Sequence, residues 1–329
     1  MSTLFRNSVF LAALLVSGAA AAQTIVQDVG LDRSESIRYD AWFDRYIVAN
    51  VTAGDAPGFI STINPDGSVD QLKWIEGGVN GVTLDNPRGT FPWNGVLYVA
   101  DNQTLRMFDL FTGAPQGEVN IPDAITLNDL TVAGNGTVFI TDSGSNDSPG
   151  AIFSVSPDQT VTRVAYGPQL NRPNGIAMNP TWGGGLQGSA IMYVELDGAD
   201  LVTMAVGSGA PPSAHAVQNP DLLSGSSQVG QELRRVTLPS GRLDGLVVLD
   251  DQLAFVSSQD PGVIYAVDGQ ERARVVFEGV PGAAAIGYDT KRDAVLIPQT
   301  RDGRLTIVDA QARPWGLSME IAPQTVSLN

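Results

Sequence analysis

The sequence of 329 residues contains no cysteine and a single histidine, His215. Without cysteine the chain can form no disulfide, no zinc–thiolate site and no iron–sulfur cluster, and it cannot use a thiol nucleophile. One histidine likewise excludes a multi-histidine metal site. Basic residues are also scarce, because 19 Lys and Arg stand against 35 Asp and Glu and the formal net charge is −16. So acidic a chain repels polyanions, and we expect no nucleic-acid partner.

The chain lacks an apolar run of the roughly 20 residues that a membrane-spanning helix needs. Its longest candidate, Val9–Val16, follows the basic Arg6 and precedes the small residues Ser17–Ala22. This three-part order is that of a secretory signal peptide with cleavage after Ala22. Residues 1–22 are therefore interpreted as a signal peptide, and residues 23–329 as one exported domain, periplasmic or extracellular, with no membrane span. A membrane anchor is the alternative, for which the run is too short.

Helical periodicity over windows of roughly eleven residues is also missing. Short segments rich in β-branched and aromatic residues, with turn residues at both ends, predict strands instead. They are Tyr46–Asn50, Val96–Asp101, Val138–Asp142, Ile191–Glu195, Leu253–Ser257 and Val295–Pro298. A strand that opens with a polar residue precedes most of them, and a hairpin with turn residues follows. The sequence therefore predicts an all-β chain built from a repeated unit of four strands.

The repeat has a regular period. Asn128 and Asn174 are 46 residues apart, Asp244 and Ala285 are 41 apart, and Glu35 and Asn128 are 93 apart, which is two units. Four-stranded units that recur at about 40–50 residues are typical of β-propellers. We predict a six-bladed β-propeller with four antiparallel strands per blade. A β-sandwich is the alternative, but it gives no reason for this period.

One blade is followed by a longer interval than the others. The interval from Asn174 to Asp244 is 70 residues, which places an insert at about 222–241 between blades 4 and 5.

The ring must also be closed by a strand from one end of the chain. Both Thr24–Asp28 and Thr325–Leu328 have the composition of a strand, and the sequence does not choose between them.

Polar residues open several of the predicted innermost strands, and the innermost strands of a propeller line its axis. Four residues far apart in the chain, Glu35, Asn128, Asn174 and Asp244, are therefore expected to converge. Two carboxylates and two amide carbonyls are hard oxygen donors that suit calcium (Ca²⁺) better than Mg²⁺ or zinc. The same residues are equally consistent with capping of strands around a wet channel, and spacing alone leaves both readings open.

The phrases that open the blades resemble a known family. Glu35–Asp40, Leu127–Asp129, Arg172–Ala177 and Leu243–Gly245 look like those of the senescence marker protein (regucalcin), gluconolactonase and luciferin-regenerating enzyme family. Those proteins are six-bladed propellers with one divalent metal on the axis. The resemblance covers nearly the whole chain after residue 22.

The resemblance implies roles for the same residues. Glu35, Asn174 and Asp244 would bind the metal, Asn128 would contact the substrate, and Asp244 would also be the general base for attack on a lactone carbonyl. The metal would polarise that carbonyl and stabilise the developing oxyanion. The implied function is metal-dependent hydrolysis of a small lactone or ester, with a small molecule as the partner.

The sequence departs from the family at one informative position. Thr126 stands where the lactonases have an arginine, two positions before the asparagine that contacts the substrate, and Arg88 or Arg172 could replace it. This departure supports the alternative of a non-catalytic propeller that binds a ligand or partner, with axial calcium as a structural ion only. A quinone-dependent propeller oxidoreductase would need a catalytic histidine, and His215 lies in a proline-rich turn instead.

Overall fold

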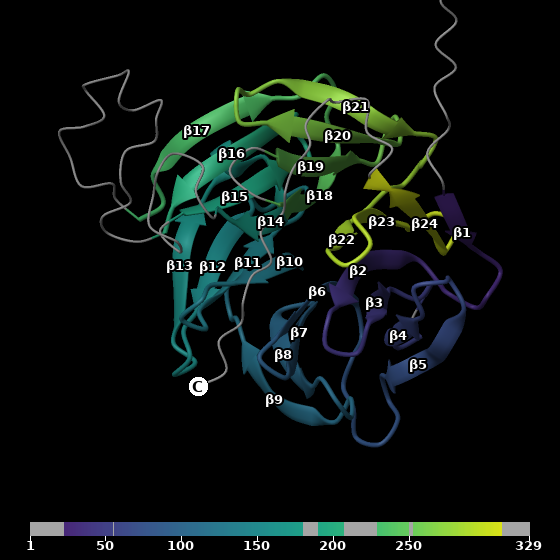
Figure 1. The fold of residues 1–329 in the computed structure, drawn as a ribbon. Helices are drawn as coiled ribbons and strands as arrows, with labels where there is room; N and C mark the ends of the chain where they lie inside the picture. The colour runs from purple at the N-terminus through teal and green to yellow at the C-terminus, as the bar shows by residue number, and fades with distance from the viewer. Residues whose placement is uncertain (1–22, 55, 180–189, 207–228, 250–252, 311–329) are drawn as a thin grey trace, which may run out of the picture.

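A computed structural model describes residues 23–54, 56–179, 190–206, 229–249 and 253–310. These residues form six sheets of four antiparallel strands around a common axis, which confirms the predicted six-bladed β-propeller (Figure 1). A 3-10 turn at Pro168–Leu170 is the only helical element that lies wholly in these ranges. Accordingly, no helix in them has the length and apolar character to span a membrane. The predicted signal peptide lies outside the described residues.

The first three blades follow each other along the chain. Blade 1 contains β2 (Ser34–Asp40), β3 (Arg45–Asn50), β4 (Phe59–Ile63) and β5 (Val69–Glu76). Blade 2 contains β6 (Pro87–Trp93), β7 (Val96–Asp101), β8 (Thr104–Asp109) and β9 (Pro115–Asn120). Blade 3 contains β10 (Leu127–Val132), β11 (Val138–Asp142), β12 (Ala151–Val155) and β13 (Val161–Tyr166).

The remaining blades have the same order from the axis outward, apart from the last. Blade 4 contains β14 (Pro173–Met178), β15 (Ala190–Glu195), β16 (Asp200–Ala205) and β17 (Glu232–Thr237). Blade 5 contains β18 (Leu243–Val248), β19 (Leu253–Ser258), β20 (Val263–Asp268) and β21 (Ala273–Glu278). Blade 6 contains β22 (Gly287–Asp289), β23 (Ala294–Gln299), β24 (Arg304–Asp309) and β1 (Gln23–Val26).

The N-terminal strand closes the ring. β1 pairs antiparallel with β24, from Gln23 opposite Val308 to Val26 opposite Leu305, and so becomes the outer strand of blade 6. Of the two closing segments that the sequence allowed, the first therefore supplies the strand. The second lies outside the described residues. Near the axis, blades 6 and 1 are further joined by hydrogen bonds from Ile37 N to Ala285 O (3.2 Å) and from Ala285 N to Glu35 O (2.9 Å).

Part of the insert expected at about 222–241 is instead a strand of blade 4. Glu232–Thr237 form β17, the outer strand of blade 4, which pairs with β16. Its charged sequence, with Val236 as the one buried residue, disguised it, because an outer strand buries less of its surface than an inner one. The residues from 207 to 228, between β16 and β17, lie outside the described residues.

The hydrophobic core is divided among the interfaces between blades. Six clusters of buried apolar residues are present in the described residues, and each draws on two neighbouring blades. Ile47 and Ile60 of blade 1, for example, pack with Leu97 and Phe108 of blade 2. Every residue of β3, β11, β15, β19 and β23 is buried, because the second strand of a blade is covered on both faces. This double burial explains the continuous apolar runs of these strands.

Small residues allow the innermost strands to approach closely at the axis. A Cβ atom on Gly175 of β14 would lie 2.3 Å from the carbonyl oxygen of Asp244 in β18. A Cβ atom on Gly245 would lie 2.3 Å from the backbone nitrogen of Ile286. Each glycine directly follows an axial polar residue, so close packing of the strands and placement of these side chains are linked.

Candidate functional site

The axial residues occupy one register position in the blades. Glu35, Arg88, Asn128, Asn174 and Asp244 are each the second residue of the innermost strand of their blade. In blade 6, Ala285 is bridged to Ser36, so Ala284 is the residue that corresponds to Glu35. The four residues predicted from sequence are all buried, with at most 6% of their surface exposed. The structure therefore places them at one end of the axis, as the repeat predicted.

Asn174 and Asp244 are in direct contact. The amide Nδ2 of Asn174 donates to Oδ2 of Asp244 at 3.3 Å, and Gln259 Nε2 at the end of β19 donates to the same oxygen. The other two oxygens, Oδ1 of Asn174 and Oδ1 of Asp244, are buried and have no hydrogen-bond partner among the described residues. Buried polar atoms are normally paired, so two neighbouring orphaned acceptors require an explanation.

Glu35 is held by a cation from the next blade. Arg88 Nη1 donates to Oε1 of Glu35 at 2.9 Å, and the two side chains are 26% and 8% exposed. From the described residues, no hydrogen bond reaches the second carboxylate oxygen of Glu35. This oxygen therefore remains available at the axis beside the two orphaned oxygens of Asn174 and Asp244.

Burial shapes the acid–base behaviour of Asp244. Desolvation raises its pKa well above the ordinary value for an aspartate, and the negative charges of Glu35 and Asp129 raise it further. The hydrogen bond from Gln259 and the charge of Arg88 oppose this shift. Burial at the axis therefore favours the neutral form of this carboxyl, and a bound cation would favour its charged form.

Asn128 is linked to Asn174 only indirectly, through the side chain of Ser143. It is 4% exposed, and its Nδ2 donates to Oγ of Ser143 at 3.0 Å. Ser143 Oγ in turn donates to the carbonyl of Pro173, the residue before Asn174. The amide nitrogen of Asn128 is thus engaged, and its oxygen is the atom that can receive a hydrogen bond.

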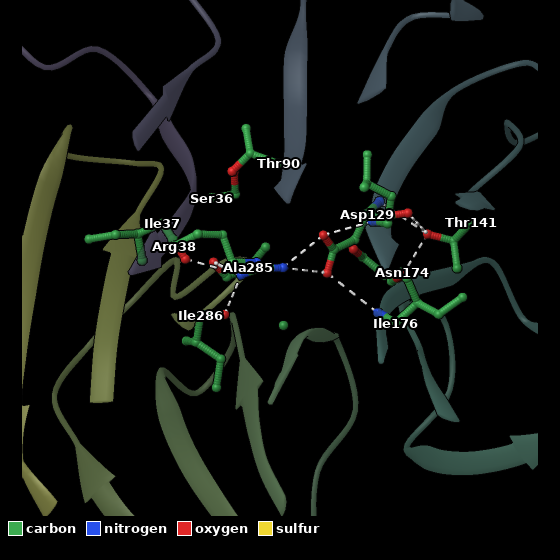
Figure 2. A network of polar contacts seen from close by, with 12 residues as sticks. Ser36, Ile37, Arg38, Thr90, Asp129, Thr141, Asn174, Ile176, Ala285 and Ile286 are labelled. Carbon is green, nitrogen blue, oxygen red and sulfur yellow. Dashed lines mark hydrogen bonds and ion pairs between the residues drawn. The ribbon is translucent and has the colours of Figure 1, made fainter. Parts of the chain in front are cut away.

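A buried ion pair crosses the axis close to these residues. Arg38 Nη2 from blade 1 lies 2.9 and 3.0 Å from the two carboxylate oxygens of Asp129 in blade 3, and Arg38 Nη1 donates to the carbonyl of Ile286 in blade 6 (Figure 2). Asp129 is fully buried and also accepts the backbone N–H of Ile176 in blade 4. Desolvation raises the pKa of Asp129, and the charge of Arg38 opposes the rise. Four of the six blades are therefore joined through one ion pair.

Hydroxyl groups strengthen the contacts around this ion pair. Thr141 Oγ1 donates to the carbonyl of Asn174 at 2.6 Å, and Ser36 and Thr90 are joined through their hydroxyls at 3.2 Å (Figure 2). These bonds run between neighbouring blades. They fix the inner strands relative to each other and so fix the residues at the axis.

The axial residues fit a divalent cation. The orphaned oxygens of Asn174 and Asp244 and the second oxygen of Glu35 are hard donors, and the two carboxylates match the charge of Ca²⁺. A group of three or more His, Asp or Glu residues that could hold a metal does not occur within the described ranges. The fit therefore depends on the amide oxygen of Asn174 as a third protein ligand beside the two carboxylates.

Three members of this constellation, Gln259, Arg38 and Asp129, were not predicted from the sequence, and the place of a fourth, Arg88, was left open. Gln259 follows an apolar strand and carries no signal in the sequence. Arg38 and Asp129 are 91 residues apart, and each resembles an ordinary charged residue of a strand. Arg88 was a candidate for replacing the arginine absent at Thr126, and the structure places it on the axis. The other candidate, Arg172, instead donates through Nε to the carbonyl of Ser143 at 3.1 Å.

Comparisons with known proteins add information about the fold. No protein-family model and no curated protein matches the sequence. Among solved structures, the chain is similar to a gluconolactonase from Xanthomonas campestris, with a TM-score of 0.64 and 15% identity over 88% of this chain and 89% of that chain. It is also similar to virginiamycin B lyase from Staphylococcus aureus, with a TM-score of 0.57 and 12% identity over 88% and 99% of the two chains. A catalytically inactive variant of that lyase, in which alanine replaces a histidine, has a TM-score of 0.56.

At these identities the similarity establishes a shared architecture. The resemblance to gluconolactonases, first inferred from short phrases at the blade openings, is confirmed at the level of the six-bladed fold. The fold and the axial residues therefore define the class of this protein. It is a six-bladed propeller with a buried polar site where its inner strands begin.

Proposed function

We propose that this chain is an exported propeller hydrolase that opens a small lactone or ester with the help of one bound divalent cation, Ca²⁺. The observation that carries the proposal is the pair of buried, unpartnered oxygens on Asn174 and Asp244. Glu35, Asn174 and Asp244 would hold the cation, which supplies positive charge for polarising an acyl carbonyl. The similarity in fold to a gluconolactonase supports the choice of substrate class.

The protein groups would carry out the proton transfers. Asp244 would accept a proton from the attacking water, as a carboxylate within reach of that water can. The water oxygen forms a bond to the acyl carbon, and the acyl–oxygen bond of the ring then breaks. The proton passes from Asp244 to the leaving alkoxide, so the products are a carboxylic acid and a hydroxyl. Asn128 orients the substrate by accepting a hydrogen bond from a substrate hydroxyl at its free amide oxygen.

The test is a turnover assay on the mature protein with a panel of lactones and aryl esters. We expect hydrolysis that chelator abolishes and calcium restores. Asp244→Asn should abolish turnover with unchanged circular dichroism, whereas Asp197→Asn, which alters an exposed carboxylate in the loop after β15, should retain it. Activity that survives both chelation and Asp244→Asn would refute the proposal.

Two other functions compete with this proposal. Thr126, in place of an arginine, favours a non-catalytic propeller in which the cation only braces the ring, and absence of turnover across the panel would support it. A lyase is less well supported, because the inactive variant of virginiamycin B lyase has lost a histidine, and the axial register of this chain carries none. The single His215 lies outside the described residues.

A further inference from the structure

Arg88 is a cation placed among the proposed ligands of another cation. It occupies in β6 the same register position that Glu35, Asn174 and Asp244 occupy in their strands. Ala284 fills this position in blade 6, because its neighbour Ala285 is bridged to Ser36, so the ring closes without a large side chain there. A long charged residue at the axis of blade 2 is therefore not required by the packing of the fold.

The hydrogen bonding of Arg88 is incomplete. Arg38 contacts both oxygens of Asp129 and a carbonyl, and Arg45 bonds to Asp40 and to the carbonyl of Leu110. Arg88 makes one hydrogen bond within the described part of the chain, to Glu35, and its Nε is buried without a partner. Because a guanidinium carries five N–H donors in a fixed planar fork, Arg88 retains the capacity to bind a second acceptor.

The charges at the axis do not cancel once a divalent cation is bound. Glu35 and Asp244 supply two negative charges, which Ca²⁺ neutralises. The charge of Asp129 is already matched by Arg38 in the ion pair across the axis. Arg88 then leaves one net positive charge at a buried site, where unbalanced charge is costly. A ligand with a single negative charge complements this site better than a neutral one.

We infer that Arg88 selects substrates that carry a carboxylate, so that the substrate class is a lactone or ester bearing one anionic group. The planar fork of arginine matches the two oxygens of a carboxylate. Glu35 holds the guanidinium at the axis, and the unpartnered Nε marks its free bonding capacity. The inference rests on the proposed function for the chemistry of the reacting group, but the charge preference comes from Arg88 itself.

Another arginine of the chain provides a matched control. Arg172 immediately precedes β14, two residues before Asn174, but it bonds to the carbonyl of Ser143 and lies 3.6 Å from the exposed Asp197. Its charge already has a carboxylate partner away from the axial group. Arg172→Gln therefore removes a positive charge near the site without removing the one at the axis.

The kinetic test compares a lactone that carries a ring carboxylate with the same lactone carrying a neutral hydroxymethyl group. For the wild type we expect kcat/KM to favour the carboxylate by about 10- to 100-fold, the range of one charged hydrogen-bonded contact. Arg88→Gln should bring the ratio close to one, mainly by raising KM for the anionic substrate, and Arg172→Gln should leave the ratio unchanged. Equal turnover of both lactones by the wild type, or an unchanged ratio in Arg88→Gln, would overturn the inference.

A binding measurement separates this inference from the proposed hydrolysis. Calorimetry on the calcium-loaded protein would use tetrahydrofuran-2-carboxylate, which cannot be hydrolysed, and neutral tetrahydrofurfuryl alcohol. Binding of the carboxylate alone, lost in Arg88→Gln and retained in Arg172→Gln, supports the inference even when no lactone is turned over. If neither compound binds, or if calcium does not bind and the charge balance is therefore absent, the inference is wrong.

Discussion

Asn174 and Asp244 are 70 residues apart in the chain, yet the amide nitrogen of Asn174 lies 3.3 Å from Oδ2 of Asp244 at the axis. Each side chain keeps its other oxygen buried and unpartnered. This arrangement costs stability in the absence of a cation and offers two ligands to one. A cation that binds both oxygens should therefore stabilise the folded state.

Calcium should stabilise the wild type against heat. At a concentration about 100 times the dissociation constant, a ligand that binds only the folded state adds about 2.7 kcal/mol to the free energy of unfolding. Glu35→Gln and Asp244→Asn should abolish the calcium-dependent rise in melting temperature, and Asp197→Asn should preserve it. In chelator, Asp244→Asn should melt no lower than the wild type, because it removes a buried charge. Differential scanning calorimetry with and without calcium measures both effects, and an equal calcium response in all four proteins would contradict the prediction.

The ion pair of Arg38 and Asp129 should contribute more to the free energy of unfolding than the ion pairs on the surface. Arg38→Met leaves the fully buried Asp129 carboxylate without its partner, and we expect a loss of about 3–5 kcal/mol in the free energy of unfolding. The double variant Arg38→Met/Asp129→Asn should recover part of that loss, because the uncompensated charge is gone. Urea denaturation of the wild type, both single variants and the double variant provides the cycle. Strict additivity of the two losses would show that the pair does not couple the blades.

Because the inner strands pack closely at the axis, we expect alanine to destabilise the protein at Gly175 but not at Gly134. Gly175→Ala places a Cβ 2.3 Å from the carbonyl oxygen of Asp244, and the resulting strand displacement should cost about 1–3 kcal/mol. The same displacement should weaken calcium binding, since Asn174 and Asp244 flank the contact. Gly134→Ala is the control, because a Cβ there meets nothing within 4 Å, and we expect a change of about 0.5 kcal/mol or less. Denaturation midpoints and calcium titration of both variants would reveal the difference, and equal behaviour would argue against the close approach.

Alkaline pH should weaken the contact between blades 1 and 6. Tyr39 donates to Asp44 at 2.9 Å, and Asp44 is bound in turn by Arg292 of blade 6. Burial, aided by Asp44, raises the pKa of Tyr39 to about 12 from a usual value of 10. Because the raised pKa favours the neutral phenol in the folded state, its contribution is complete below pH 10 and is lost as the pH rises toward 12.

Tyr39→Phe isolates this contribution from other alkaline titrations. The wild type should be the more stable protein at pH 9, and the difference in free energy of unfolding should shrink between pH 10 and 12. Denaturant titrations at a series of pH values would measure it. A gap between the two proteins that stays constant to pH 12 would contradict the assigned pKa.

Local sequence pattern predicted most of the fold for a physical reason. The second strand is buried throughout in five of the blades, so segments such as Ala294–Gln299 are rich in apolar residues and easily detected. The charged outer strand Glu232–Thr237 was interpreted as part of an insert, because one exposed face removes that signal. Glu35, Asn128, Asn174 and Asp244 were found because each opens an inner strand, and the repeat makes equivalent positions converge.

The sequence by itself determined the number of blades, most of the inner strands within them and four polar residues of the axis, since these depend on period and on burial along single strands. Only the tertiary structure decided that β1 closes the ring, that Arg88 shares the axial register, and that Gln259 and the Arg38–Asp129 pair support the site. Those contacts join residues that no local pattern relates. They depend on how six sheets pack around one axis, where small residues such as Gly175 let the inner strands meet.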